Sequence, residues 1–211
     1  MTGLREQLRL YLVTDSALCS AFGLIETVQQ AVAGGVTMVQ LRAKDASTPA
    51  RIEMAIALKN ALMGTGVPLI VNDDLEAAVA ADTDGAHIGQ GDMAPTQARA
   101  RLGSNKILGL SCETKQAVQA ANPDIVDYLG LGPVFGTATK ADHARPIGFD
   151  GLARLVSLTS LPTVAIGGLK AMHQRDVLAS GADGQAVVSA ICGQADPKVA
   201  AQLFCQTEPQ S

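Results

Sequence analysis

Short apolar runs alternate with helix-like segments along the whole chain, and this alternation constrains the fold more than any other feature. The runs are rich in valine, isoleucine and leucine, and alanine-rich stretches of helical period separate them. Eight such runs occur: Leu10–Val13, Met38–Leu41, Leu69–Val71, Ala86–Ile88, Ile107–Leu110, Tyr128–Leu131, Thr163–Ile166 and Ala186–Val188. Strands that alternate with helices form a parallel sheet, and strands that are apolar throughout are buried on both faces.

Glycine, proline and hydroxyl residues mark the ends of the helices between these runs. A glycine just after a periodic stretch is a stop signal, and a hydroxyl residue followed by proline is a start signal. The expected helices with such signals are Glu26–Ala33 before Gly34, one that starts at Ser47-Thr48-Pro49, Met93–Leu102 with Pro95 near its start, and Lys170–Ala179 before Ser180-Gly181.

Eight strand-and-helix units in 211 residues predict a single domain, a closed (β/α)₈ or TIM barrel over residues 1–211, with a frayed polar tail at 206–211. The alternative is an open, doubly wound parallel sheet. Such a sheet normally carries a glycine-rich turn after its first strand. Here the first run is followed by Thr14-Asp15-Ser16, so closure is the favoured interpretation.

Composition excludes several classes of partner. The net charge is −4, tryptophan is absent and aromatic residues make up only 3%, which argues against a nucleic-acid groove. No apolar stretch reaches the ~20 residues that span a membrane, and residues 1–9 lack the apolar core of a signal peptide. The four cysteines show no CxxC spacing and indicate free thiols of a cytoplasmic protein. A monomer and a homo-oligomer are both compatible with this sequence.

Polar residues and glycines follow the apolar runs directly. In a closed barrel these positions meet at one rim, where barrel enzymes place their active sites. The segments concerned are Gln40–Lys44, Asn72–Asp74, His87–Asp92, Ser111, Gly132–Lys140, Gly167-Gly168 and Ser189. We therefore expect a site for a phosphorylated small molecule, held by a few local donors.

Two pairs of charged residues on this rim suit a diphosphate and a metal ion. Arg42 and Lys44 lie two positions apart, so their side chains point the same way on an extended segment and can bind a polyanion. Asp73 and Asp92 follow neighbouring strands and can hold Mg²⁺, which prefers oxygen ligands and bridges phosphates. Asp74 is equally well explained as a helix cap.

Gly167-Gly168 and Ser189 follow the seventh and eighth runs, where barrels often hold a phosphate. Glycines admit a phosphate to backbone N–H groups, and we expect a short helix N-terminus to complete the cradle. The segment Gly132–Gly148 exceeds the usual loop length, which indicates a functional or mobile loop. For His87 we expect a supporting role or packing inside the barrel, and for Cys112 a small buried side chain.

Taken together, these stretches resemble the thiamine-phosphate synthase family. The resemblance rests on LYLVTD, GGVTMVQLRAKD, LIVNDD, DGAHIGQGD, LGLGPVFGTATK, PTVAIGG and GADGQAVVSAI, which extend from Leu10 to Ile191. It implies a transferase of thiamine biosynthesis that joins 4-amino-2-methyl-5-pyrimidinylmethyl diphosphate to a thiazole ethyl phosphate and releases pyrophosphate. The expected reaction is a dissociative, carbocation-like displacement, for which no protein nucleophile is needed.

The resemblance also implies a role for each matching residue. Gln40 would bind the aminopyrimidine, and Asp73 and Asp92 would bind Mg²⁺. The diphosphate would be held by Arg42, Lys44, Asn72, Ser111 and Lys140, of which all but Asn72 are expected to take part in catalysis. The thiazole phosphate would be held by Thr137, Thr139, Gly168, Val188 and Ser189.

Three positions depart from the family pattern: Gly136 stands in place of a usual proline, Cys112-Glu113 in place of a His-bearing stretch, and Gln185 in place of an aliphatic residue. Two other functions stay open at this point. One is a thiazole tautomerase on the same barrel, which would not need the diphosphate-binding set. The other is a non-catalytic binder of a phosphorylated ligand, which would not need the pair of aspartates.

Overall fold

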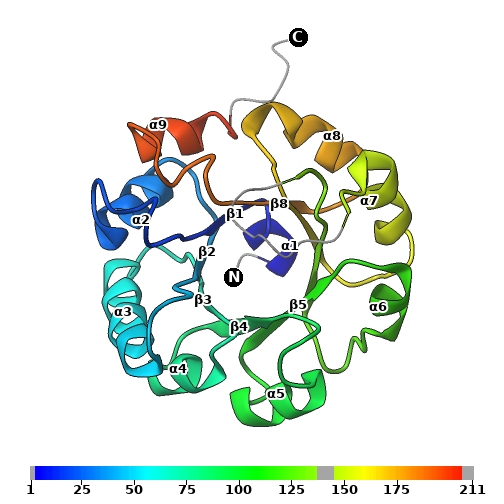
Figure 1. Ribbon diagram of the computed structural model, residues 1–211, viewed down its shortest axis with the longest axis horizontal. Helices are drawn as coiled ribbons and strands as arrows, with labels where there is room; N and C mark the ends of the chain where they lie inside the picture. The colour runs from blue at the N-terminus through cyan, green and yellow to red at the C-terminus, as the bar shows by residue number, and fades with distance from the viewer. Residues whose placement is uncertain (1–2, 137–144, 206–211) are drawn as a thin grey trace.

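The computed structural model describes residues 3–136 and 145–205, and these residues form a closed barrel of eight parallel strands (Figure 1). Neighbours in the sequence are neighbours in the sheet, and β8 pairs with β1 to close it. The strands are β1 Leu10–Val13, β2 Met38–Leu41, β3 Leu69–Asn72, β4 Gly85–Ile88, β5 Ile107–Cys112, β6 Tyr128–Leu131, β7 Thr163–Ile166 and β8 Gly184–Val187. The predicted barrel and its eight runs are thus confirmed, with strand ends that differ from the predicted ones by up to two residues.

Helices form a ring around the strands in Figure 1, whereas α1 lies across one end of the barrel. They are α1 Leu4–Gln7, α2 Leu24–Ala33, α3 Thr48–Ala61, α4 Leu75–Ala80, α5 Pro95–Leu102, α6 Lys115–Ala120, α7 Gly148–Val156, the 3₁₀ turn η1 Ala171–His173, α8 Gln174–Ala179 and α9 Pro197–Gln202. The expected start of α3 is confirmed, because the Ser47 hydroxyl accepts the Ala50 N–H. The expected end of α2 before Gly34 is confirmed as well. The expected helix over Lys170–Ala179 instead begins as the 3₁₀ turn.

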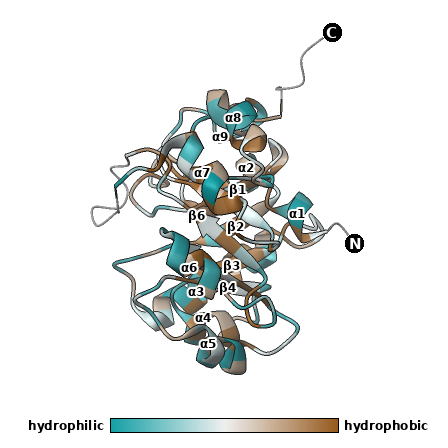
Figure 2. Cartoon of the chain, turned by 90° about the vertical axis from the view of Figure 1, so that its right-hand side faces the viewer, coloured by the Kyte–Doolittle hydropathy of each residue, from teal (hydrophilic) through white to brown (hydrophobic). Residues whose placement is uncertain are grey.

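Two apolar cores lie on the two faces of the strands. Alternate residues of a strand face opposite sides, so Leu12 packs outward against the helices while Tyr11 and Val13 point into the barrel. In Figure 2 hydrophobic residues gather around the strands, and hydrophilic ones colour surrounding helices such as α6 and α8. None of the helices in the described part of the chain is long and apolar enough to cross a membrane.

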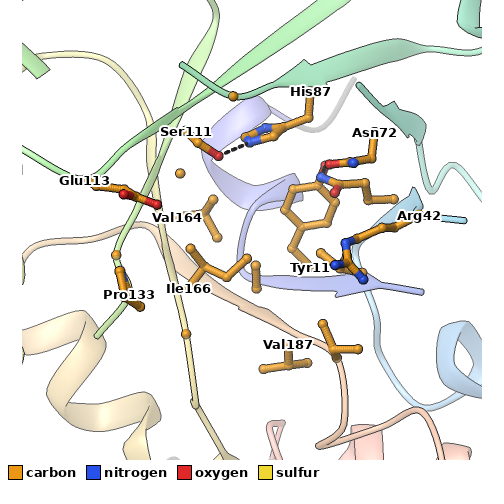
Figure 3. Close-up of a pocket in the computed structure, with 18 of the residues that line it drawn as sticks. Tyr11, Arg42, Asn72, His87, Ser111, Glu113, Pro133, Val164, Ile166 and Val187 are labelled. Atoms are coloured by element: carbon orange, nitrogen blue, oxygen red, sulfur yellow. Dashed lines mark hydrogen bonds between the residues drawn. The ribbon is translucent and has the colours of Figure 1, made fainter. Parts of the chain in front are cut away.

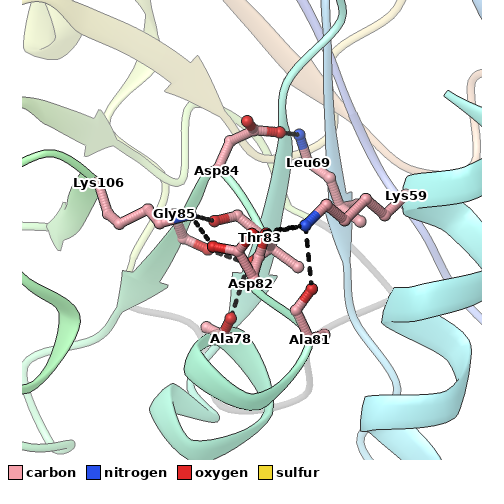
Figure 4. A network of polar contacts seen from close by, with 9 residues as sticks. All are labelled: Lys59, Leu69, Ala78, Ala81, Asp82, Thr83, Asp84, Gly85 and Lys106. Carbon is pink, nitrogen blue, oxygen red and sulfur yellow. Dashed lines mark hydrogen bonds and ion pairs between the residues drawn. The ribbon is translucent and has the colours of Figure 1, made fainter. Parts of the chain in front are cut away.

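The amino ends of the strands are closed by a repeated side-chain contact. The residue just before each even-numbered strand accepts a backbone N–H from the first or second residue of the preceding odd-numbered strand. The pairs are Thr37 with Leu10 (2.9 Å), Asp84 with Leu69 (2.8 Å), Asp127 with Leu108 (2.7 Å) and Asp183 with Thr163 (2.7 Å). Figure 4 shows the second of these beside Asp82, which binds Lys59 and Lys106.

Helix α1 adds an apolar and an ionic contact at the same end. Leu4 and Leu8 pack on the core inside the barrel, and the Arg5 guanidinium binds the Asp183 carboxylate (2.7 Å) and the Ser160 carbonyl (2.7 Å). This end is therefore filled and hydrogen-bonded, and the opposite end, where the strands finish, is where a cavity can form.

All four cysteines are free thiols, as expected. Cys112 is fully buried, as predicted for a small core side chain. Gln185 is also fully buried, in β8, and neither its Nε2 nor its Oε1 has a hydrogen-bond partner among the described residues. Its register partners Leu10 and Ala165 both belong to the core between barrel and helices, so the amide lies among apolar groups.

We predict that Gln185→Leu stabilises the protein. An unpaired buried amide costs about 1–3 kcal/mol, and an apolar side chain of similar size removes that cost. The free energy of unfolding, measured by urea titration, should rise by about this amount. Gln174, which is buried but has polar partners, offers a matched control, because Gln174→Leu should lower it. A loss of stability in Gln185→Leu would contradict the assignment of an unsatisfied amide.

Candidate active site

A cavity of about 480 Å³ opens at the carboxyl ends of the strands (Figure 3). Every predicted site residue that the structure describes lines it: Gln40, Arg42, Lys44, Asn72, Asp73, Asp92, Ser111, Gly168, Val188 and Ser189. The other three, Thr137, Thr139 and Lys140, lie outside the described residues. These ten residues come from six segments of the sequence, and they meet at one place because parallel strands all end on the same side.

The two cations after β2 are held in place by neighbouring groups. The Arg42 guanidinium lies 3.5 Å from the carboxylate of Asp15, which follows β1, and the Arg42 N–H donates to the Thr14 hydroxyl (3.0 Å). The guanidinium of Arg51, in α3, donates to the carbonyls of Ala43 and Lys44 (3.0 Å each). Backbone and side-chain contacts therefore fix the segment that presents both cations to the cavity.

Asp73 and Asp92 come together at the ends of β3 and β4, as predicted. Asp73 has a left-handed backbone (φ 62°), its N–H donates to the His87 carbonyl (2.8 Å), and its carboxylate accepts the amide N–H of Asn72 (2.6 Å). The Asp92 carboxylate accepts the N–H of Gly89 (2.7 Å). Left-handed backbone is uncommon for a non-glycine residue and occurs where surrounding structure enforces it.

The two carboxyl groups influence each other. Burial of the carboxyl group and the facing carboxylate of Asp92 raise the pKa of Asp73 to about 6. Repulsion of this kind is relieved when a dication binds between the two oxygen donors, so the donor set fits Mg²⁺. In residues 3–136 and 145–205 no cluster of three or more His, Cys, Asp or Glu side chains forms.

Asp74 is a helix cap and not a site residue. Its carboxylate accepts the Ala77 N–H (2.9 Å) at the start of α4 and binds the Arg51 guanidinium (2.9 Å). Between the two interpretations that the sequence left open, the structure therefore selects the cap.

The opposite side of the cavity is built from glycine backbone. Gly167 and Gly168 both have positive φ (106° and 61°), and a Cβ on either would come within 2.6 Å of atoms of the β6–α7 segment. Ser189 follows β8 in a turn in which the Ile191 and Cys192 N–H groups bond to the Val188 carbonyl (3.1 and 2.8 Å). The expected short helix N-terminus does not occur at Ser189, where the chain makes a single turn and α9 begins only at Pro197.

The long segment after β6 is anchored at both of its ends. The Val134 and Phe135 N–H groups donate to the carbonyls of Ile166 and Gly167 (2.9 and 3.0 Å). On its return, the Gly148 N–H donates to the Val134 carbonyl (3.0 Å). Both ends of this segment therefore lie beside the glycine turn.

The sequence analysis missed a polar chain inside the barrel. Tyr11 and Tyr128, the only tyrosines in the sequence, share a hydrogen bond (2.8 Å), and the Gln40 amide donates to Tyr11 (2.8 Å). His87 Nδ1 bonds to the Tyr128 hydroxyl and His87 Nε2 to the Ser111 hydroxyl, both at 2.9 Å. Figure 3 shows the second of these bonds. His87 thus supports the site, as expected. Tyrosine within two otherwise apolar strands, in a chain with few aromatic residues, was the available signal.

Comparisons with known proteins agree with this geometry. A model of the family described as thiamine monophosphate synthase matches residues 10–191. A Psychrobacter protein named thiamine-phosphate synthase is 54% identical over 202 residues, which cover 94% of each chain. A protein of the same name from Xanthobacter autotrophicus is 52% identical over 93% of each chain.

Solved structures give the same result. A thiamine phosphate pyrophosphorylase from Pyrococcus furiosus superposes with a TM-score of 0.88 at 35% identity, over 97% of this chain and 96% of that one. A 3-hexulose-6-phosphate synthase, at 18% identity over 93% of this chain and 97% of that one, has a TM-score of 0.66 and shares the fold alone. A family match over most of the chain and relatives of about half-identical sequence leave one conclusion: this chain belongs to the thiamine monophosphate synthase family.

Proposed function

We propose that this chain is a thiamine-phosphate synthase, which couples 4-amino-2-methyl-5-pyrimidinylmethyl diphosphate to 4-methyl-5-(2-phosphoethyl)thiazole and releases pyrophosphate. The observation that carries the proposal is the division of one cavity into two phosphate-binding sides. Cations and facing carboxylates from the β2, β3 and β4 ends line one side, and glycine backbone with Ser189 lines the other. A reaction that joins a diphosphate to a monophosphate needs both.

The first side would bind and stabilise the leaving diphosphate. Arg42 and Lys44 supply positive charge, and Asn72 and Ser111 supply hydrogen-bond donors, where negative charge develops as the bond to the pyrimidine breaks. Lys140 would add a third cation from the segment outside the described residues. Mg²⁺ held by Asp73 and Asp92 would neutralise phosphate charge on the leaving group.

The second side would hold the thiazole by its phosphate. Gly168, Val188 and Ser189, with Thr137 and Thr139 from the undescribed segment, would anchor that group and place the thiazole nitrogen near the carbocation. The cavity is also lined by Val164, Ile166 and Ala186, whose apolar side chains would keep water away from the reacting carbon. Gln40 would orient the aminopyrimidine, whose amino group donates electrons to the cation.

The two alternative functions use less of the cavity. A tautomerase acting on the thiazole alone would leave Arg42, Lys44 and the aspartate pair without a ligand. A binder without catalysis would have no need of two facing carboxylates, one with a pKa raised to about 6. The coupling reaction provides a ligand for both cations and for the aspartate pair.

The direct test is to incubate the purified protein with both substrates and Mg²⁺ and to detect products by mass spectrometry. We expect thiamine phosphate and pyrophosphate in equal amounts, with no product in the presence of EDTA and recovery on adding Mg²⁺. Failure to form thiamine phosphate from correctly folded protein would overturn the proposal.

The aspartates should determine the metal requirement. Asp73→Asn and Asp92→Asn replace a charged oxygen ligand by an amide, and we expect each to lower kcat/KM by about a hundredfold at limiting Mg²⁺. Because the pKa of Asp73 is about 6, protons should compete with the metal, so the apparent Mg²⁺ affinity of the wild-type protein should fall as pH drops below 6. The exposed Asp124→Asn serves as control. Unchanged activity of both site variants at limiting Mg²⁺ would show that the metal binds elsewhere.

The two sides of the cavity should respond differently to substitution. Arg42→Ala removes a charge that acts mainly in the transition state and should lower kcat by about a hundredfold, or about 3 kcal/mol. Ser189→Ala removes a ground-state contact and should raise the KM for the thiazole phosphate about tenfold while kcat changes little. Steady-state kinetics with each substrate varied in turn would separate these profiles. Identical profiles for the two variants would refute the division of the cavity.

A further inference from the structure

Four hydrogen bonds connect Gln40 to Ser111 through the interior of the barrel. They run from the Gln40 amide to Tyr11, from Tyr11 to Tyr128, from Tyr128 to His87 Nδ1, and from His87 Nε2 to the Ser111 hydroxyl, with lengths of 2.8 to 2.9 Å. Both ends of this chain line the cavity, whereas Tyr128 is completely buried. Two substrate-facing side chains are thus connected by groups that the proposed reaction has not yet used.

The barrel makes room for this chain with glycines. A Cβ on Gly109, in β5, would collide with the Tyr128 ring and with His87 Nδ1, and a Cβ on Gly130, in β6, would lie 3.2 Å from His87 Cε1. The rings of His87 and Tyr128 lie 5.4 Å apart between centroids, so each limits the rotation of the other. The glycine backbone of β5 and β6 therefore helps to fix the positions of the His87 and Tyr128 rings, together with the contact between the rings themselves.

The protons of the chain can be ordered by requiring that every buried O–H has an acceptor. The Tyr11 oxygen accepts the amide N–H of Gln40, so its own proton can go to Tyr128, and the Tyr128 proton to His87 Nδ1. If His87 instead donated from Nδ1, the Tyr128 proton would turn to Tyr11, and the buried Tyr11 proton would have no acceptor, because Gln40 faces Tyr11 with its amide nitrogen and not with its oxygen. A buried hydroxyl without a partner is costly, which selects the first order.

Both tyrosines keep their protons, because burial raises the pKa of each above its ordinary value. The neutral ring of His87 then carries its proton on Nε2 and donates it to Ser111. Ser111, whose oxygen accepts this bond, has its own proton left for a group in the cavity. At the other end, the amide of Gln40 is turned so that Nε2 faces Tyr11, and its Oε1 is left to accept from a ligand.

We propose that Tyr11 and Tyr128 are positioning residues. They form the middle of a chain of hydrogen bonds in which every proton points from Gln40 towards Ser111. The chain orients the Gln40 oxygen as an acceptor for an amino group and the Ser111 hydroxyl as a donor to a phosphate oxygen. The chemical roles of the two ends rest on the proposed function. The order of the protons does not, because it follows from the contacts inside the barrel.

The proton order is tested in ligand-free protein by ¹⁵N NMR of the histidine rings at alkaline pH, where a neutral ring shows which nitrogen carries the proton. His87→Gln assigns the signals. We expect His87 to be protonated on Nε2 alone. Protonation on Nδ1, or on both nitrogens, would overturn the proposal, and this result needs no turnover, so it is independent of whether the chain couples the two substrates.

Two variants, each lacking one tyrosine hydroxyl, distinguish a positioning role of the tyrosines from a role in protein stability alone. Tyr128→Phe removes the donor to Nδ1, so the His87 signals should show mixed tautomers and kcat should fall about tenfold or more. Tyr11→Phe keeps that donor, so the tautomer should persist while the KM for the pyrimidine diphosphate rises. Near wild-type kinetics in both variants, or equal losses of activity with unchanged ring-nitrogen signals, would show that the tyrosines serve stability alone.

Discussion

Closure of the parallel barrel is the constraint on which the rest of the structure depends. Leu12 of β1 pairs with Val39 of β2 on one side and with Val187 of β8 on the other, so the sheet has no free edge. Because all eight strands run the same way, residues from distant parts of the sequence leave the sheet at the same rim. Asp73 and Asp92 can face each other because β3 and β4 are neighbours.

The two ends of the barrel are built from different chemistry. At the amino ends, Asp84, Asp127 and Asp183 satisfy backbone N–H groups of neighbouring strands, and α1 covers the opening with Leu4 and Leu8. Those carboxylates are used for folding. At the carboxyl ends the carboxylates and cations line a cavity, where a ligand can reach them.

The sequence predicted the architecture and nearly the whole rim because both depend on local patterns. Apolar runs such as Leu69–Val71 are buried on both faces, and the polar residues directly after them must lie at the strand ends. Contacts between strands are not local, which is why the chain from Gln40 through Tyr11 and Tyr128 to Ser111 could not be foreseen. It depends on which residues share a layer inside the closed sheet.

The roles of some other residues could not be predicted from the sequence because they depend on which groups lie next to them in the fold. Asp74 carries the same carboxyl group as Asp73, and only the Ala77 N–H and the Arg51 guanidinium show that it caps a helix. The turn after β8 does not continue as a helix, because Gly193, with φ 79°, and the bonds to the Val188 carbonyl end it after one turn. The amide of Gln185, in contrast, was conspicuous in the sequence and is unpaired among the described residues.

We propose above all that the rim binds a diphosphate together with a divalent cation between Asp73 and Asp92. A crystal structure of the protein with inorganic pyrophosphate and Mn²⁺, recorded at a wavelength where manganese scatters anomalously, tests it most directly. We expect an anomalous peak in contact with both carboxylates, and pyrophosphate that contacts the metal ion and the Arg42 guanidinium. A metal ion bound away from these aspartates, or pyrophosphate ordered only beside Gly168 and Ser189, would contradict it.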